Sequence, residues 1–227
     1  MAKETKIRWF GHSAFQITSG AGTVILTDPF GGDMGSYTIP SVSPDAVTVS
    51  HEHGDHNNLK AAKGNPTILR GLTGGGRDWN TVDRKVKDVR IYNVAGTYHD
   101  GEKGTKRGKN SPFVFEMDDL RIVHLGDLGH VLTDDQIKKI GAIDIILVPI
   151  GGYYTIDAKE ATKVMDQLKP KIAVPMHYKT AAISSWPISS TDDFLKGKKV
   201  RQAGGNTLTV SKEMLPAQTE VVVVDYD

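Results

Sequence analysis

Cysteine is absent from this chain of 227 residues, and the absence limits its chemistry. No disulfide can stabilise the fold, and no thiolate can bind a metal ion or act as a nucleophile. Any metal site must therefore be built from nitrogen and oxygen donors. The lack of cysteine is also compatible with a reducing compartment.

Long apolar runs are missing too. The longest, Ile143 to Ile150 and Val221 to Val224, have the length of a strand, whereas a membrane-spanning helix needs roughly 20 apolar residues. The first residues, Met1 to Trp9, lack the apolar core of a signal peptide. We therefore expect no membrane association and a cytoplasmic location.

A large net charge of either sign is also lacking. The chain has 28 Lys and Arg residues against 27 Asp and Glu residues, which gives a formal net charge of +1. Such a balance produces no long-range field to attract nucleic acid or an anionic membrane. We therefore expect a small-molecule substrate and no nucleic-acid partner, and we leave open whether the chain forms a homo-oligomer.

Two common catalytic motifs are not found. The chain has no Gly-x-Ser-x-Gly nucleophile elbow, which argues against a serine hydrolase. The glycine run Gly74 to Gly76 lacks the Lys and the Ser or Thr of a phosphate-binding loop, so we interpret it as a flexible turn.

Four potential metal ligands do occur within six residues, in the sequence His-Glu-His-Gly-Asp-His from His51 to His56. They directly follow the run Ala46 to Ser50, which predicts a buried strand. Imidazole and carboxylate suit zinc, manganese or iron, and two overlapping pairs can serve two adjacent ions from one loop. The pattern favours a metal site over the alternative of a solvated polar turn.

Apolar patterns predict strands through most of the chain. They are expected at residues 6–10, 15–18, 23–27, 46–50, 66–70, 89–94, 113–117, 120–125, 143–149 and 171–175. Helix signals predict a short helix at 58–63 and capped helices at 133–140 and 157–168. Because no linker divides the chain, we expect a single domain over residues 1–227.

Three further candidate ligands also follow predicted strands. His99 comes after residues 91–94, Asp127 follows residues 121–125 through Gly126, and His177 follows residues 172–176. Ligand sites in sheet proteins form at strand ends, where loops converge. Together with the loop from His51 to His56, these residues predict one metal site assembled from distant parts of the chain.

These residues resemble the metallo-β-lactamase superfamily, and within it a bacterial metal-dependent hydrolase branch similar to ascorbate-6-phosphate lactonase. The resemblance covers nearly the whole chain and is carried by Trp9–Ser13, Leu26–Phe30, Ser50–His56, Leu125–His130, Pro149–Ala158 and Val174–Tyr178. It implies an α+β fold, an αββα sandwich in which two mixed β-sheets pack face to face with helices on the outside.

The resemblance also implies a metal-dependent hydrolase with two divalent metal ions. Zinc is the first expectation, and nitrogen and oxygen donors also accept manganese or iron. The implied ligands are His51, His53 and His99 for the first ion, Asp55, His56 and His177 for the second, and Asp127 for both. Asp28 is implied to support the metal loop from behind.

The catalytic candidates are Asp55 and Asp127, since either carboxylate could orient a water molecule or carry its proton. Two ions held roughly 3.5–4 Å apart lower the pKa of a shared water toward about 7. We expect hydrolysis of a lactone or ester bond in a small, anionic metabolite. The alternatives are a phosphodiesterase or nuclease of the same superfamily and a non-enzymatic metal-binding protein.

The remaining histidines have more open roles. His12 could bond to Asp28 or line the cleft, or it could be a structural residue of its turn. His130 could approach substrate or donate to a metal ligand, because it follows the Asp127 loop. His124 lies within an alternating strand pattern, so we expect it to pack inside the fold.

Loops and aromatic residues near the ligands are candidates for substrate contact. Tyr178 is the best of three tyrosines considered, because it adjoins a candidate ligand; the others are Tyr153 and Tyr154. The loop from Gly101 to Lys109 carries positive charge that could bind a carboxylate or phosphate. The segments 31–40 and 180–195 are expected to shape the pocket.

Overall fold

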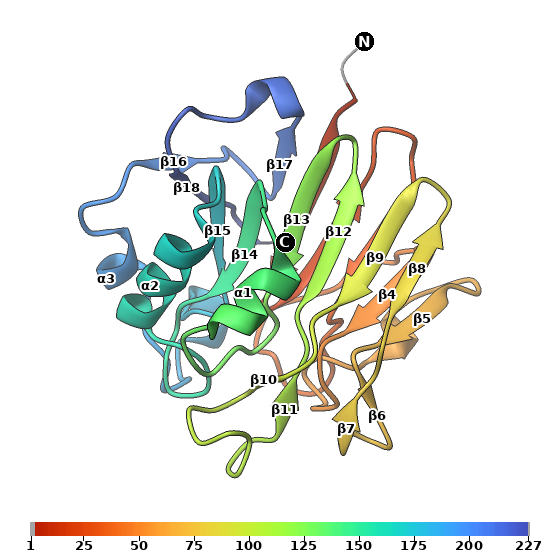
Figure 1. Cartoon of the computed structure of the whole chain (residues 1–227), viewed down its shortest axis with the longest axis horizontal. Helices are drawn as coiled ribbons and strands as arrows, with labels where there is room; N and C mark the ends of the chain where they lie inside the picture. Colours follow the sequence, from red (N-terminus) through yellow and green to blue (C-terminus); the bar gives the residue numbers. More distant parts are fainter. Residues whose placement is uncertain (1–2, 227) are drawn as a thin grey trace.

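The computed structural model describes residues 3–226, which form two mixed β-sheets packed face to face (Figure 1). The first sheet has six strands in the order β17-β1-β2-β3-β4-β5. Its members are β1 (Thr5–Gly11), β2 (Ala14–Thr18), β3 (Val24–Thr27), β4 (Ala46–Val49), β5 (Thr67–Arg70) and β17 (Thr207–Val210). The strands β3, β4 and β5 run parallel, and the other pairs are antiparallel.

The second sheet has eight strands in the order β16-β18-β15-β14-β13-β12-β9-β8. They are β8 (Asp83–Val86), β9 (Val89–Asn93), β12 (Phe113–Met117), β13 (Leu120–His124), β14 (Ile145–Pro149), β15 (Ile172–Met176), β16 (Val200–Gln202) and β18 (Glu220–Val223). The strands from β13 to β16 pair in parallel, and those from β8 to β13 are antiparallel. Two short hairpins complete the chain: β6 (Leu72–Thr73) with β7 (Asp78–Trp79), and β10 (Thr97–Tyr98) with β11 (Lys109–Asn110).

Strand alternation divides the apolar side chains between two clusters. Ile7 and Trp9 of β1 belong to the principal core, which draws residues from both sheets, while the adjacent Phe10 belongs to the second cluster. In the second cluster, Phe30 and Ile183 pack on the outer face of the six-stranded sheet. The segment 30–42 and the 3₁₀ turn Ala181–Ile183 therefore cover that face.

The α-helices lie against the eight-stranded sheet, and Figure 1 shows α1 (Asp134–Ile140) in front of β13 and β14 and α2 (Ala158–Leu168) next to β15. A short third helix, α3 (Asp192–Leu195), packs against α2. Thr133 and Asp157 each begin a helix with a capping box, in which the side chain accepts from the third backbone amide of the helix. The predicted helices at 133–140 and 157–168 are thus confirmed.

All ten predicted strands are present, displaced by at most two residues at either end. The predicted helix at 58–63 is only a 3₁₀ turn, Leu59–Ala61. The α+β sandwich expected from the sequence is confirmed, and the principal core combines residues from both ends of the chain. A single domain over residues 1–227 is consistent with that core and stays a prediction.

Side-chain contacts also join the two sheets near the N-terminal end of β4, away from the loop that follows this strand. Asp45, just before β4, forms an ion pair of 2.6 Å with Lys87 in the turn between β8 and β9. Asp118, in the turn between β12 and β13, accepts hydrogen bonds from Thr5 Oγ1 at 2.8 Å and from the Gly20 amide at 2.6 Å. Turns of one sheet therefore hold strand ends of the other.

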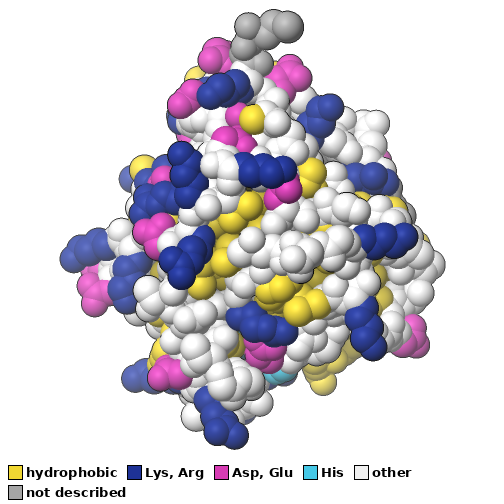
Figure 2. Space-filling model, turned by 90° about the vertical axis from the view of Figure 1, so that its right-hand side faces the viewer, with side chains coloured by type: hydrophobic (Ala, Val, Ile, Leu, Met, Phe, Trp, Pro, Cys, Tyr) yellow, Lys and Arg dark blue, Asp and Glu magenta, His cyan; other side chains and the backbone are white. Residues whose placement is uncertain are grey.

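The surface seen in Figure 2 carries Lys and Arg side chains scattered among acidic and uncharged ones, with apolar bands between them. Histidine is almost hidden on this face and shows only near the lower end of the molecule. Among residues 3–226, none of the helices combines the length and the apolar character that a membrane span requires.

Candidate metal centre

The seven candidate ligands converge at one end of the sandwich, beyond the strands that precede them. The loop from His51 to His56 follows β4, and His99 follows β10. Asp127 and His177 come after β13 and β15 of the other sheet. Because the parallel strands end on the same side, side chains that are far apart in sequence become neighbours. Figure 1 shows the hairpin β10–β11 at this end.

One oxygen atom of Asp127 lies at the centre of the cluster. Its Oδ2 is 3.9 Å from Nε2 of His51, 3.2 Å from Nε2 of His56, 3.1 Å from Nε2 of His99 and 3.3 Å from Nε2 of His177. The Asp127 side chain is only 2% exposed. A buried carboxylate surrounded by four imidazole nitrogens is a donor arrangement that suits divalent metal ions.

A first group of three histidines, His51, His53 and His99, has ligand atoms within 4.8 Å of one another. Ser50 Oγ lies 2.9 Å from Nδ1 of His51, so the opposite nitrogen, Nε2, is left facing the group. That Nε2 and both ring nitrogens of His99 are buried without a hydrogen bond among the described residues. Because a buried, unsatisfied nitrogen costs about 1–3 kcal/mol, a metal ion fits this cradle.

Asp28 accepts hydrogen bonds from two residues, Ser50 and His56, on the side of the metal loop away from the candidate centre. Its Oδ2 accepts hydrogen bonds from Nδ1 of His56 at 3.0 Å and from Ser50 Oγ at 2.5 Å, and its Oδ1 accepts from the Ser50 amide at 2.8 Å. Since Ser50 donates its hydroxyl proton to Asp28, its oxygen accepts from Nδ1 of His51. One carboxylate therefore orients two imidazoles toward the centre.

A second group of three histidines, His12, His56 and His177, also has ligand atoms within 4.8 Å. Nε2 of His12 is 3.2 Å from Asp55 Oδ2 and 3.1 Å from Nε2 of His56. It does not bond to Asp28, the partner considered from the sequence, and although it contacts Asp55, its fully buried side chain is not among the residues that line the cleft. Asp55 is itself 3.7 Å from Nε2 of His56 and remains 32% exposed.

Two of these histidines are held in an uncommon backbone conformation. His12 and His177 both have φ of 52°, in the left-handed region that L-residues rarely adopt. The His177 amide donates to the His12 carbonyl at 3.1 Å, and Trp9 Nε1 donates to the same carbonyl at 3.1 Å. Such conformations persist where surrounding contacts over-determine them, and they cluster at functional sites.

The electrostatic environment fixes the charge of several groups in the cluster. Burial lowers the pKa of His12 to about 4 and that of His51 well below its ordinary value, so both rings are neutral. Burial opposes ionisation of Asp127, yet the surrounding imidazoles hold its pKa well below the usual range. Burial also opposes a charge on His56, but Asp127 and Asp28 hold its pKa well above normal, so metal binding must release that proton.

Two glycines near the candidate ligands Asp127 and His99 have no room for a side chain. A Cβ atom on Gly126, whose φ is 56°, would lie 2.4 Å from Asn110 Oδ1 and 2.6 Å from Ser50 Cβ. A Cβ on Gly129 would lie 2.3 Å from the Asp100 nitrogen, next to His99. Asn110 also accepts a hydrogen bond from the Asp127 amide at 3.1 Å. Sequence reasoning missed this asparagine because its partner is 17 residues away.

The cleft over the centre has a volume of about 330 Å³. Its lining residues are His53, Asp55, His99, Arg107, Asp127, Tyr154, His177 and Trp186. The expected contribution of segment 180–195 is provided by Trp186, which the sequence did not single out. Tyr154 and Arg107, one from the considered tyrosines and one from the basic loop, are both in the lining.

Tyr178 does not line this cleft. It is 7% exposed and its ring centroid is 5.2 Å from that of Trp9, within the principal core. Its ring belongs to that core and is not among the side chains that line the cleft. We therefore withdraw substrate contact for Tyr178.

His124 and His130 occupy structural positions. His124 is buried on β13, where Nε2 donates to the Ser13 carbonyl at 2.8 Å and Nδ1 accepts from the Gly126 amide at 3.1 Å. This is the packed strand histidine that was expected. Nε2 of His130 accepts from the Tyr98 amide at 3.1 Å, so this ring supports the backbone just before His99.

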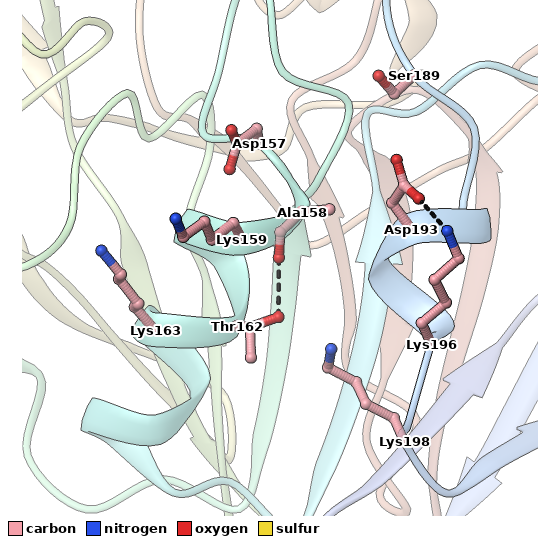
Figure 3. A pocket seen from close by; sticks show the side chains of 9 residues that line it. All are labelled: Asp157, Ala158, Lys159, Thr162, Lys163, Ser189, Asp193, Lys196 and Lys198. Carbon is pink, nitrogen blue, oxygen red and sulfur yellow. Dashed lines mark hydrogen bonds and ion pairs between the residues drawn. The ribbon is translucent and has the colours of Figure 1, made fainter.

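A larger cavity of about 590 Å³ lies between α2 and α3, but its charged groups are largely satisfied within the chain. Figure 3 shows Lys196 turned toward Asp193, at 2.7 Å, and Lys159 and Lys163 on the side of α2 away from α3. Lys198 donates to a backbone carbonyl at 2.6 Å. This surface depression has none of the convergent donors found at the histidine cluster, so we assign the functional site to the cluster.

Comparison with known proteins agrees with this geometry. The Beta-lactamase superfamily domain matches residues 6–177, most of the chain. A UPF0173 metal-dependent hydrolase from Nanoarchaeum equitans is 32% identical, over 92% of this chain and 97% of its own. The chain belongs to the metallo-β-lactamase superfamily. A second UPF0173 metal-dependent hydrolase, from Thermococcus onnurineus, is 31% identical over 82% of this chain and 88% of its own.

A solved structure shows the same superfamily fold. It is a protein from Thermotoga maritima described as a candidate zinc-dependent hydrolase of the metallo-β-lactamase superfamily. It is 38% identical, with a TM-score of 0.77, over 98% of this chain and 100% of that one. The superfamily member described here is therefore a metal-dependent hydrolase, with histidine and aspartate groups able to hold metal.

Proposed function

We propose that the chain binds two divalent metal ions and uses them to hydrolyse a lactone or ester bond of a small, anionic metabolite. One observation carries the proposal: Oδ2 of Asp127 lies 3.1–3.9 Å from the Nε2 atoms of four histidines. A carboxylate oxygen so placed can be shared between two ions, whereas a single ion would leave part of this donor set unused.

We assign the donors to two sets around Asp127. His51, His53 and His99 would hold the first ion, and Asp55, His56 and His177 would hold the second. His12 lies beside the second set and donates a hydrogen bond to Asp55. Its Nε2 is also close to His56, near the position that a ligand of the second ion would occupy. Zinc is the first expectation for both positions, since imidazole and carboxylate suit it, and manganese or iron are alternatives.

The metal ions, when bound, supply Lewis acidity and a water molecule that ionises near neutral pH. Asp55 and Asp127 would have different roles beside that water. Asp127 is buried and has four imidazole neighbours, so it holds the centre together. Asp55 is 32% exposed at the cleft, and its pKa is held well below normal, against the effect of burial, by the His12 hydrogen bond. It therefore stays ionised and can accept a hydrogen bond from the water.

The size and walls of the cleft favour a small substrate. A volume of about 330 Å³ is at the lower end of the range for small-molecule sites. Tyr154 and Trp186, whose ring centroids are 6.0 Å apart, form an aromatic side of the cleft that would exclude water from the substrate. The near-zero net charge favours a metabolite over a polynucleotide.

A reconstitution experiment tests this proposal. Metal-free protein is loaded with zinc, manganese or iron, its metal content is measured, and each form is assayed with lactones, carboxylic esters, phosphodiesters and β-lactams. We expect close to two ions per chain and turnover of lactones or esters. A metal content near zero after reconstitution, or turnover of RNA, DNA or phosphodiesters without lactone or ester hydrolysis, would contradict the proposal.

A further inference from the structure

Arg107 lines the same cleft as His53 and His99, yet it is no part of the candidate metal centre. Its guanidinium lies over the ring of Tyr154, 5.5 Å from the centroid, and over that of Tyr153 at 6.0 Å. Stacking on an aromatic face leaves the N–H groups at the edge of the guanidinium free to donate to a ligand. Arg107 is thus held beside the reaction site with donors available.

Arg107 differs from the two other cations that line the neighbouring surface, Lys106 and Lys109, because no carboxylate of the described residues neutralises it. Lys106 pairs with Glu102, and Lys109 lies 2.9 Å from Asp78. Within residues 3–226, no carboxylate lies within ion-pair distance of the Arg107 guanidinium. A cation that lines a cleft without a protein counter-charge is suited to a negatively charged ligand.

The backbone that carries Arg107 is fixed by a buried acid. Asp100 is 5% exposed and accepts four backbone hydrogen bonds. The donors are the amides of Glu102 at 2.8 Å, Gly104 at 2.8 Å, Lys106 at 3.1 Å and Arg107 at 2.7 Å. Since Asp100 directly follows the candidate ligand His99, the turn is built onto the metal centre.

The turn is closed by two more contacts. The His99 amide donates to the Gly108 carbonyl at 3.0 Å, and the Gly108 amide donates to the Gly104 carbonyl at 3.0 Å. Gly104 has φ of 80°, and a Cβ there would lie 2.8 Å from the Gly108 carbonyl oxygen. These hydrogen bonds fix the backbone that carries Arg107. Less conformational entropy is therefore lost when Arg107 binds a ligand.

A second cavity adjoins the first at Arg107. It has a volume of about 360 Å³ and shares Arg107 and His53 with the cleft over the metal centre. Lys106 and Lys109 also line it. Arg107 therefore lies where the two cavities meet, so a substrate whose reactive bond is at the metal centre could extend its other end to the guanidinium.

We propose that Arg107 is the specificity-determining residue of this site and that it binds a carboxylate or phosphate-monoester group at the end of the substrate remote from the scissile bond. The inference rests on the proposed hydrolytic function and adds to it the location of the anion. An arginine fork gives charge-assisted, bidentate hydrogen bonds to either anion. Asp100 acts as a positioning residue for this contact.

Three matched aryl esters test the role of Arg107 in turnover. They share the leaving group and chain length and end in a methyl, a carboxylate or a phosphate group. For Arg107→Met we expect kcat/KM to fall about 10- to 100-fold with the two anionic esters and to change less than about twofold with the methyl ester. The ratio of the two anionic esters identifies the preferred anion. Lys103→Gln, an exposed charge on the same turn, is the matched control and should change none of the three.

Equilibrium binding tests the same contact without turnover. Glutarate and glycerol phosphate are titrated into metal-loaded protein and into metal-loaded Arg107→Met, whose metal content and thermal unfolding are checked to be unchanged. We expect the variant to bind the preferred anion about 10- to 100-fold more weakly. Arg107→Lys should recover only part of the loss, because a single ammonium cannot form the bidentate contact.

The two measurements separate the inference from the function on which it rests. Equal binding of both anions by the native chain and by Arg107→Met would overturn the inference, even if lactones or esters are hydrolysed. Anion binding that depends on Arg107, without hydrolysis of any ester, would overturn the proposed reaction and leave the assignment of Arg107 in place.

Discussion

Asp28 accepts a hydrogen bond from Nδ1 of His56 at 3.0 Å, and this contact commits the other ring nitrogen to the candidate metal centre. The two residues are 28 positions apart: Asp28 directly follows β3, and His56 lies in the loop that follows the neighbouring parallel strand β4. A carboxylate behind a metal-binding imidazole fixes its tautomer and makes it a better donor. Asp28, which is not one of the seven candidate ligands, thus determines the tautomer and the donor strength of the candidate ligand His56.

The first prediction concerns Asp28. Asp28→Asn should weaken binding of zinc by about 10- to 100-fold, because His56 and Ser50 lose a charged acceptor. Competition with a chromophoric chelator measures the affinity, and circular dichroism checks the fold. Asp33→Asn, an exposed acid in the loop that follows β3, is the control. Unchanged zinc affinity in folded Asp28→Asn would contradict the role assigned to Asp28.

Asp127 should be the most damaging single ligand to replace. In Asp127→Ala we expect the loss of both ions, and a fall in hydrolytic turnover of at least about 100-fold, because all the surrounding imidazoles lose their common neighbour. His53→Ala, which removes an exposed ligand of one set, should retain about one ion. Elemental analysis of the two purified variants makes the comparison. A full metal complement in Asp127→Ala would show that the carboxylate is dispensable.

His124 should matter for stability and not for chemistry. Replacing it with Phe leaves the Gly126 amide without a partner and the Ser13 carbonyl with only the Thr27 hydroxyl as donor, at a cost of about 1–3 kcal/mol in the free energy of unfolding. Urea denaturation measures that loss, and activity below the transition should remain. A variant that is folded and metal-loaded but inactive would place His124 in the reaction instead.

His12 should affect the second ion more than the first. It donates to Asp55 and lies 3.1 Å from Nε2 of His56, but it has no such contact with the first group of histidines. His12→Ala should therefore bind one ion with nearly native affinity and the other about 10- to 100-fold more weakly. Calorimetric titration with zinc resolves the two events. Equal weakening of both would show a general disturbance of the turn.

The stability of the sandwich should depend on pH through Asp45. The ion pair with Lys87 holds the pKa of Asp45 below its ordinary value. A depressed carboxyl pKa adds stability above the unfolded value of about 4, and that stability is lost as the pH falls through the folded value. Since both partners are partly exposed, the contribution is at most about 1 kcal/mol.

The matched variant for this last effect is Asp45→Asn. It should be less stable than the native chain in urea at pH 7, and the difference should shrink below pH 4, where the native carboxyl becomes protonated. A difference that stays constant between pH 7 and pH 3 would mean that packing, and not charge, is responsible.

The sequence was sufficient for features that depend on local patterns. The apolar run Phe113–Met117 predicted β12 with the bounds that the structure shows, and the helix starts at Thr133 and Asp157 followed from capping residues. The strand β8, Asp83–Val86, was missed because it lies at the edge of its sheet with mostly exposed polar side chains, so no apolar period marks it.

The site was predictable only in part, for a related reason. A dense motif marks His51 to His56, and strand ends mark the later candidates, but contacts between distant turns leave no sign in one sequence. Trp186 lines the cleft from a segment without periodicity, and Asn110 binds the Asp127 backbone from a short hairpin. The assignments of individual ligands to metal ions stay predictions.

The hydrogen bond from the His177 amide to the His12 carbonyl has a consequence for biosynthesis. The ribosome makes the chain from the N-terminus, so His12 and the loop from His51 to His56 emerge early. Their partners Asp127 and His177 follow much later, and the preceding strands β13 and β15 must first pair with their neighbours in the eight-stranded sheet. A nascent chain shorter than residue 177 therefore cannot assemble the whole centre, and full metal uptake belongs to the last stage of synthesis.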